Sequence, residues 1–234
     1  MAEKLKYFVN GQFRESKTDK WYDLHNPSTG ETTGQAPCCT NDEVLEAIAA
    51  AKAAYPGWSA TPAIKRAQIL YRVRELILER MDELTMSVAK ENGKVWAESE
   101  GDVLKAKEGT ELATQVPSLM MGESIMDASR GYDTVKYREP LGVFAGIVPV
   151  NFPAMIPFGW MAPTCIAAGN TLVLKAASLT PKTAMLFAQL YKDAGVPDGV
   201  INVVTCSRNE INTILEHPDV KGLSLIHISE PTRP

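Results

Sequence analysis

Three short apolar, β-prone runs in the second half of the chain constrain its fold more than any other feature. They are Val143 to Val148, Thr171 to Lys175 and Val200 to Thr205, and they lack polar alternation, as expected of strands covered on both faces. Helix-length segments separate them, and Leu223 to Ile228 alternates like a fourth strand. This β-α-β-α-β-α-β order predicts an α/β fold with a doubly wound parallel sheet, helices on both faces and right-handed crossovers.

The segments between these runs carry helix signals. Residues 154 to 168 are apolar and helix-sized, and Pro157 and Pro163 are expected to bend them. Thr180-Pro181 favours the start of a helix that Gly195 closes.

A hairpin and a layer of amphipathic helices are predicted ahead of the sheet. Asn10-Gly11 lies between two β-prone runs and favours a type I′ turn, because both central residues of that turn need positive φ. Thr40 and Glu43 form a capping box that opens the first of three predicted helices. The other two are expected over residues 61 to 92 and 97 to 113.

Composition and charge exclude several classes of partner. The formal net charge is -4 and the pI about 5.5, so neither a nucleic acid nor an anionic membrane is expected as a partner. No apolar run reaches the ~18 residues of a membrane span, and no secretory signal follows Met1. The four cysteines fit neither a zinc site nor a disulfide framework, so we expect no metal and a cytoplasmic location.

The turn after the first apolar strand is the best local candidate for a site. Pro149 and Pro153 flank Asn151 there, and ligands of such sheets bind at the carboxyl ends of the strands. The Asn151 amide could donate to a developing oxyanion or cap the helix that follows. The dinucleotide fingerprint GxGxxG is absent after this strand, so spacing alone leaves a nucleotide, a phosphosugar or no ligand open.

The chain resembles the aldehyde dehydrogenase superfamily over about residues 7 to 224. The resemblance lies in segments that keep the family's order and spacing: Pro140-Leu141-Gly142-Val143, Pro149-Val150-Asn151-Phe152-Pro153, Ala168 to Lys175, and Ala194 to Val204. Within the superfamily, two further segments resemble the CoA-acylating methylmalonate-semialdehyde dehydrogenase branch: Asn151 to Pro157 and Pro117 to Glu123.

That resemblance implies an enzyme that oxidises a small aldehyde with NAD. The acyl group passes from a cysteine thioester to coenzyme A, with release of CO2 when the substrate carries a β-carboxylate. The resemblance also implies a homo-oligomer for the intact parent only, with an exposed oligomerisation strand at about 123–140. It implies an oxyanion-hole amide at Asn151 and cofactor contacts at Val148, Pro149, Val150, Lys175, Ser178 and Leu179.

Two positions depart from the family's pattern. Ser178 stands where NAD-preferring members usually have a glutamate, and a serine does not repel a 2′-phosphate, so NADP is not excluded. Lys105 stands where the branch usually has an arginine that holds the substrate carboxylate. Lysine keeps the charge but loses the bidentate fork, which leaves a simpler aldehyde possible as the substrate.

The expected boundaries follow from the same resemblance. Residues 1–222 are expected to be the NAD-binding region, whereas residues 223–234 resemble a translated sequencing adapter and are expected to be a non-native tail. None of the four cysteines matches the family's nucleophile, so the catalytic domain is expected to be absent and this chain inactive. Two alternatives stay open, a hydrolytic aldehyde dehydrogenase and a non-catalytic nucleotide-binding module.

Overall fold

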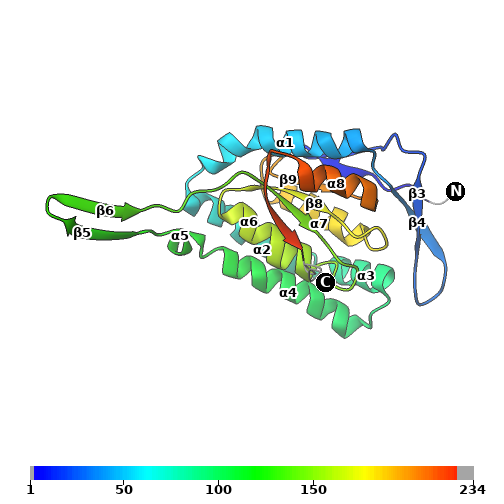
Figure 1. The fold of residues 1–234 in the computed structure, drawn as a ribbon. Helices are drawn as coiled ribbons and strands as arrows, with labels where there is room; N and C mark the ends of the chain where they lie inside the picture. The colour runs from blue at the N-terminus through cyan, green and yellow to red at the C-terminus, as the bar shows by residue number, and fades with distance from the viewer. Residues whose placement is uncertain (1–2, 226–234) are drawn as a thin grey trace, which may run out of the picture.

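The computed structural model describes residues 3–225, in which one mixed sheet lies between helices (Figure 1). The sheet has six strands in the order β10-β7-β8-β9-β1-β2. The first four of these pair in parallel, whereas β1 pairs antiparallel with both β9 and β2. Their bounds are β1 Tyr7–Val9, β2 Gln12–Arg14, β7 Val143–Ile147, β8 Thr171–Lys175, β9 Ile201–Val204 and β10 Val220–Leu225.

The predicted doubly wound sheet is confirmed. From β7 the chain runs outward to β8 and β9, and then returns to place β10 on the other side of β7. The strand order therefore reverses between β7 and β10, which is where ligands enter such sheets. The fourth strand, predicted over 223–228, begins three residues earlier, at Val220, and is described as far as Leu225; residues 226–228 of the prediction lie outside the described residues. Most of the expected non-native tail, residues 226–234, lies outside the described residues.

Alternate residues of the strands build a hydrophobic core on each face of the sheet. On β8, Leu172 and Leu174 belong to the larger core and Val173 to the smaller one, as the period of two requires. The larger core is covered by α7 Lys182–Asp193, by α6 Ala162–Ala167 and by a layer of three helices, α2 Ala63–Glu79, α3 Met81–Asn92 and α4 Trp96–Ala113. The smaller core is covered by α1 Asn41–Ser59 and α8 Arg208–Glu216.

The apolar segment after β7 changes its helix type along its length. Residues Ile156–Met161 form a π-helix, η1, and Pro163 lies in the first turn of α6. The π-helix packs directly on α4, Trp96–Ala113. A Cβ built on Gly109 would come within 2.1 Å of the Gly159 carbonyl oxygen, so these two backbones approach closely only because both residues are glycine.

The helix predicted over residues 61–92 is two helices. They are α2 Ala63–Glu79 and α3 Met81–Asn92, and Arg80 between them has φ −110° and ψ 21°. The Arg80 guanidinium binds Glu83 at 2.8 Å and Asp193 at 3.4 Å, which fixes the bend against α7. Gly93 ends α3 in the left-handed conformation, as predicted.

The amino-terminal hairpin has the predicted turn and a partner that the sequence did not indicate. Asn10 and Gly11 both have positive φ, 51° and 69°. Phe8 pairs with Val203, so the hairpin extends the main sheet instead of standing alone. A second hairpin joins β3 Trp21–His25 to β4 Thr32–Pro37 through a turn rich in Asn, Pro and Gly at residues 26–30.

The exposed strand expected near residues 123–140 is a two-stranded arm. Strands β5 Glu123–Ser129 and β6 Tyr132–Lys136 pair only with each other, and every residue in them is exposed. Figure 1 shows the arm projecting away from the sheet and helices, beyond the short helix α5 Val116–Leu119. Within residues 3–225, no helix is both long and apolar enough to cross a membrane.

Candidate functional site

The carboxyl ends of β7, β8 and β9 bring the candidate cofactor residues to one edge of the sheet. Ile147 is in register with Lys175, and Lys175 with Val204. The Val148 N–H donates to the Lys175 carbonyl at 3.2 Å, so the pairing continues to the first residue beyond β7. Segments far apart in the sequence therefore meet at the carboxyl edge of the sheet, beside β7, where the strand order reverses toward β10.

Lys175 lies half-buried at the end of β8. Burial lowers the pKa of its ammonium, and the thiols of Cys206 and Cys38 partly oppose that shift. No carboxylate is among the groups that act on it within the described residues. A partly desolvated ammonium without a carboxylate partner is suited to an oxygen-rich ligand.

Apolar side chains lie beside this cation on the same edge. Leu179 is 58% exposed in the turn after β8, and Val150 is 44% exposed in the turn after β7. Pro149 and Ser178 are half-buried. The edge thus offers exposed apolar surface next to one ammonium, a combination that suits a flat, partly polar ligand.

Asn151 is exposed in the loop between β7 and η1. It does not cap the helix that follows: the Met155 N–H at the start of that helix donates instead to Asp102 Oδ1, at 2.7 Å. The interpretation of Asn151 as a helix cap is therefore wrong. Its side-chain amide therefore lies at the carboxyl edge of the sheet and has no helix-capping role.

Three residues that the sequence analysis missed hold this loop. Asn92 ends α3, Lys94 lies between α3 and α4, and Asp102 lies on α4. The sequence contains a signal for one of the three, Asp102. Asp102 belongs to the buried stripe of α4 together with Val103 and Ala106, and an acid on an apolar stripe needs a specific partner.

Lys105 lies on α4, exposed, and it is already paired. Its ammonium is 2.6 Å from Glu108 Oε2. Both residues line a hollow of about 440 Å³ between α4 and the π-helix segment. The remaining lining residues are small or apolar apart from one threonine: Gly109, Leu112, Gly159, Trp160 and Thr164.

The four cysteines are poorly placed for nucleophilic work. Cys38, Cys39 and Cys206 are buried, and Cys165 on α6 is half-buried. Burial raises the pKa of Cys39 and Cys206 to about 12, and the thiolate is the reactive form. The expectation that none of them serves as the nucleophile agrees with this burial. Residues 3–225 also contain no group of three or more histidine, cysteine or acidic side chains that could hold a metal.

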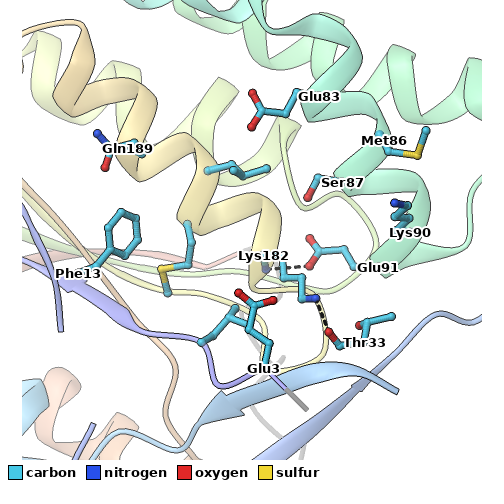
Figure 2. Close-up of a pocket in the computed structure, with 13 residues that line it drawn as sticks. Glu3, Phe13, Thr33, Glu83, Met86, Ser87, Lys90, Glu91, Lys182 and Gln189 are labelled. Atoms are coloured by element: carbon cyan, nitrogen blue, oxygen red, sulfur yellow. Dashed lines mark hydrogen bonds between the residues drawn. The ribbon is translucent and has the colours of Figure 1, made fainter. Parts of the chain in front are cut away.

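A second hollow, of about 470 Å³, lies between α3, α7 and the amino-terminal segment. Figure 2 shows the Glu91 carboxylate directed at the backbone of Lys182, and the Lys182 ammonium directed at Thr33. Both are engaged in the fold: Glu91 accepts from the backbone of α7, and the Lys182 ammonium donates to the Thr33 carbonyl at 2.8 Å. None of the candidate site residues lines this hollow, so we assign the chemistry to the carboxyl edge of the sheet.

Comparison with known proteins gives a consistent set of relatives. The model of the aldehyde dehydrogenase family matches residues 13–227. The acylating methylmalonate-semialdehyde/malonate-semialdehyde dehydrogenase of Homo sapiens mitochondria is 43% identical over 222 residues, which are 95% of this chain and 41% of that protein. Malonate-semialdehyde dehydrogenase 2 of Geobacillus kaustophilus (strain HTA426) is also 43% identical, over 96% of this chain and 46% of that protein.

Solved structures give the same result. One from Sinorhizobium meliloti 1021, assigned as a methylmalonate-semialdehyde dehydrogenase and complexed with NAD, is 33% identical with a TM-score of 0.93, covering 95% of this chain and 45% of that one. An NADP-dependent enzyme of E. coli is 35% identical with a TM-score of 0.90, covering 94% and 46%. The chain thus spans less than half the length of the relatives it matches.

Proposed function

The chain belongs to the aldehyde dehydrogenase family, and from that premise we propose that it forms the NAD(P)-binding region and the oxyanion side of an enzyme that oxidises a small aldehyde. The observation that carries this proposal is the meeting of Lys175, Val148 and the Asn151 loop at one edge of the sheet. The relatives' shared architecture supports it, since the matched structures include an NAD complex and an NADP-dependent enzyme.

The carboxyl edge fits a dinucleotide. The Lys175 ammonium has no carboxylate acting on it within the described residues, so it is free to donate to the hydroxyls of a ribose. Val150 and Leu179, in the turns after β7 and β8, offer exposed apolar surface on the same edge, against which flat rings pack. Val148, Pro149 and Ser178 complete the proposed contacts. When bound, NAD supplies the acceptor for the hydride of the aldehyde carbon.

Ser178 leaves the choice between NAD and NADP open. It is half-buried in the turn that follows β8, three residues after Lys175. Its hydroxyl can bind a ribose hydroxyl but does not repel a 2′-phosphate, and Lys175 would attract one. We propose that NAD is the usual cofactor and that NADP is also accepted.

Asn151 would act on the carbonyl oxygen of the aldehyde. When a thiolate adds to the carbonyl carbon, the C=O π electrons move to the oxygen, which becomes an alkoxide. An amide N–H that faces the alkoxide stabilises it, and such a donor contributes about 3–4 kcal/mol in known enzymes. The four buried or half-buried cysteines do not supply this thiolate, so we expect the 234-residue chain by itself to produce no NAD(P)H from an aldehyde.

The finer proposal concerns the fate of the acyl group. The names of the human and other mammalian relatives carry the word acylating, which supports transfer of the acyl group to coenzyme A, with methylmalonate or malonate semialdehyde giving propanoyl- or acetyl-CoA. The alternative is a hydrolytic aldehyde dehydrogenase. A non-catalytic nucleotide-binding module is the third possibility, and an intact enzyme that reduces NAD(P) would exclude it.

Lys105 is the proposed contact for a substrate carboxylate. Its pairing with Glu108 at 2.6 Å means that a carboxylate must displace an existing partner, so we expect a weaker grip than an unpaired arginine would give. A short aldehyde without a carboxylate therefore remains a reasonable substrate for the hollow beside α4.

The arm β5–β6 is the proposed site of homo-oligomer formation in the intact protein. Its exposed apolar side chains include Ile125 at 60% and Met126 at 75% exposure, and two strands with free edges can extend a neighbour's sheet. We propose that residues 1–222 form the NAD-binding region with this arm and that the catalytic cysteine lies elsewhere in the protein. The cytoplasmic location stays a prediction, and the human relative's name places that protein in mitochondria.

Nucleotide binding tests the proposal on the chain itself. Saturation-transfer difference NMR detects millimolar binding of NAD+ and NADP+ to the 234-residue chain. Lys175→Met is expected to weaken binding of both nucleotides by about tenfold, because a charged hydrogen bond of roughly 1.5 kcal/mol or more is lost. Lys65→Met, which changes an exposed lysine of α2, is the matched control. Binding that is equally strong in both variants would refute the assignment of Lys175.

A further inference from the structure

The loop that carries Asn151 is held from both sides by polar side chains of another segment. Before Asn151, the Val150 carbonyl accepts from Asn92 Nδ2 at 2.7 Å. Directly after it, the Phe152 ring lies under the Lys94 ammonium, 4.0 Å from the ring centroid. Further on, the Met155 N–H donates to Asp102 Oδ1 at 2.7 Å. The three holding residues lie within eleven positions of one another at the junction of α3 and α4.

Asp102 is the centre of this arrangement. Its side chain is fully buried, and Oδ2 is 3.2 Å from the Lys94 ammonium, which is itself only 15% exposed. Burial raises the pKa of Asp102, against the opposing effects of its bonds to the Met155 and Ala154 N–H groups and of Lys94. A buried ion pair stabilises a fold poorly compared with apolar packing. Here the Asp102–Lys94 ion pair instead fixes the positions of the groups that the two side chains contact.

Asn151 itself is left exposed between these held residues. The backbone on each side of it is therefore held, while Asn151 itself is exposed to solvent. A donor that is fixed before the reaction needs no reorganisation when charge develops, which is the main source of oxyanion stabilisation.

We propose that Asp102, together with Lys94 and Asn92, is a positioning group that sets the direction of the Asn151 amide. The inference rests on the proposed function, because it assumes that Asn151 faces the reacting oxygen. Asp102 and Lys105 are three residues apart on α4 and are therefore neighbours on that helix, Asp102 on its buried stripe and Lys105 on its exposed face. The helix that lines the proposed substrate hollow thus also holds the oxyanion loop.

Backbone exchange in the loop tests this inference without any turnover. Hydrogen exchange is followed by mass spectrometry over residues 148–158 of the 234-residue chain, in the wild type and in Asp102→Ala. The substitution is expected to speed exchange at residues 150–155 by about tenfold or more, because the loop loses a charged acceptor. Asp102→Asn keeps an acceptor for the Met155 N–H and is expected to give a smaller change. The matched carboxylate control, Glu98→Gln on the same helix, is expected to change nothing.

A second readout follows Asn151 directly. The side-chain amide signals of Asn151 in ¹⁵N spectra, assigned by their loss in Asn151→Ala, are expected to shift in Asp102→Ala and to stay in place in Glu98→Gln. Unchanged loop exchange and an unshifted Asn151 signal would overturn the inference. Exchange that speeds up equally in β9 would also overturn it, since Asp102 would then support the whole fold and not the loop. Neither readout uses nucleotide, so failure of NAD(P) binding contradicts the proposed function alone.

Discussion

At the scale of single residues, burial changes the chemistry of several acids, and Glu91 is the clearest case. It lies at the end of α3 and accepts from the Lys182 and Thr183 N–H groups at 2.8 and 3.0 Å, at the first turn of α7 (Figure 2). Burial raises the pKa of this carboxyl from 4.5 to about 7, although both bonds favour the ionised form. The carboxyl of Glu91, which binds the first turn of α7, therefore makes the free energy of unfolding depend on pH near neutrality.

We predict that Glu91 makes the chain less stable as the pH rises from about 4.5 to about 7. In that window the folded chain keeps a proton that the unfolded chain releases, so the free energy of unfolding falls, by at most roughly 1.4 kcal/mol per pH unit. Glu91→Gln is expected to remove this slope in urea unfolding curves. Glu83→Gln is the control, because Arg80 lowers the pKa of that carboxyl and its effect has the opposite sign. Equal slopes in the wild type and Glu91→Gln would contradict the prediction.

The site residues differ in how far the sequence could identify them. Asn151 and Lys175 were recognisable because they stand in motifs at strand ends, and the register of β7 and β8 brings those ends together. The position of Asp102 on an apolar stripe indicated a buried acid in need of a partner, but its role was not recognisable, because that role depends on contact with Met155, more than fifty residues later in the chain. Lys105 and Glu108 are only three residues apart. Their pairing was still not recognisable from the sequence, because a lysine on an exposed helix face can adopt rotamers with or without this contact.

At the scale of elements, two capping boxes of the same kind have different surroundings. In α1, Thr40 accepts from the Glu43 N–H at 3.3 Å, and Glu43 accepts from the Thr40 N–H at 2.8 Å. Glu43 also binds the Ser16 hydroxyl at 2.7 Å and the Lys17 N–H at 2.8 Å. In α8, the side-chain hydrogen bonds that the corresponding Glu210 makes to the described residues stay within its own box.

We predict that Glu43→Ala destabilises the chain more than Glu210→Ala. The loss of a cap alone costs about 1 kcal/mol, whereas Glu43 also leaves partners of a second segment without their acceptor, for a total of roughly 2–3 kcal/mol. The difference is measured by urea unfolding of the two variants side by side. Equal losses would mean that the segment at Ser16 and Lys17 gains nothing from Glu43.

The elements show where local patterns suffice and where they do not. Asn10-Gly11 fixed its own turn because the required backbone angles belong to those two residues. The pairing of Phe8 with Val203 joins strands almost the whole chain apart, and no local pattern specifies such a partner. Neither a glycine nor a proline marks the break between α2 and α3 at Arg80, so the helical periodicity of the sequence did not indicate that break.

At the scale of the whole molecule, the arm stands apart from the body. Every residue of β5 and β6 is exposed, and the two strands pair only with each other. Tyr132 and Tyr137 are 72% and 79% exposed, which is unusual for large apolar side chains that gather in one place. We propose that a second copy of the intact protein covers these exposed side chains of the arm.

We predict that the arm contributes little to the stability of this chain. Replacing Ile125 and Val135 together by serine is expected to change the free energy of unfolding by less than about 0.5 kcal/mol, as for other surface positions. Val143→Ser, in the buried strand β7, is the contrasting control and is expected to cost several kcal/mol. A large loss from the arm variant would mean that the arm packs on the body of the same chain.

The central claim is that a dinucleotide binds at the carboxyl edge of the sheet. Chemical-shift mapping of NAD+ on the ¹⁵N-labelled 234-residue chain tests it most directly. We predict that the shifts cluster at Val148 to Asn151 and at Lys175 to Leu179, and that they leave the hollow between α3 and α7 unchanged. Shifts confined to Glu91 and Lys182 in that hollow, or no shifts in a folded chain at millimolar nucleotide, would contradict the claim.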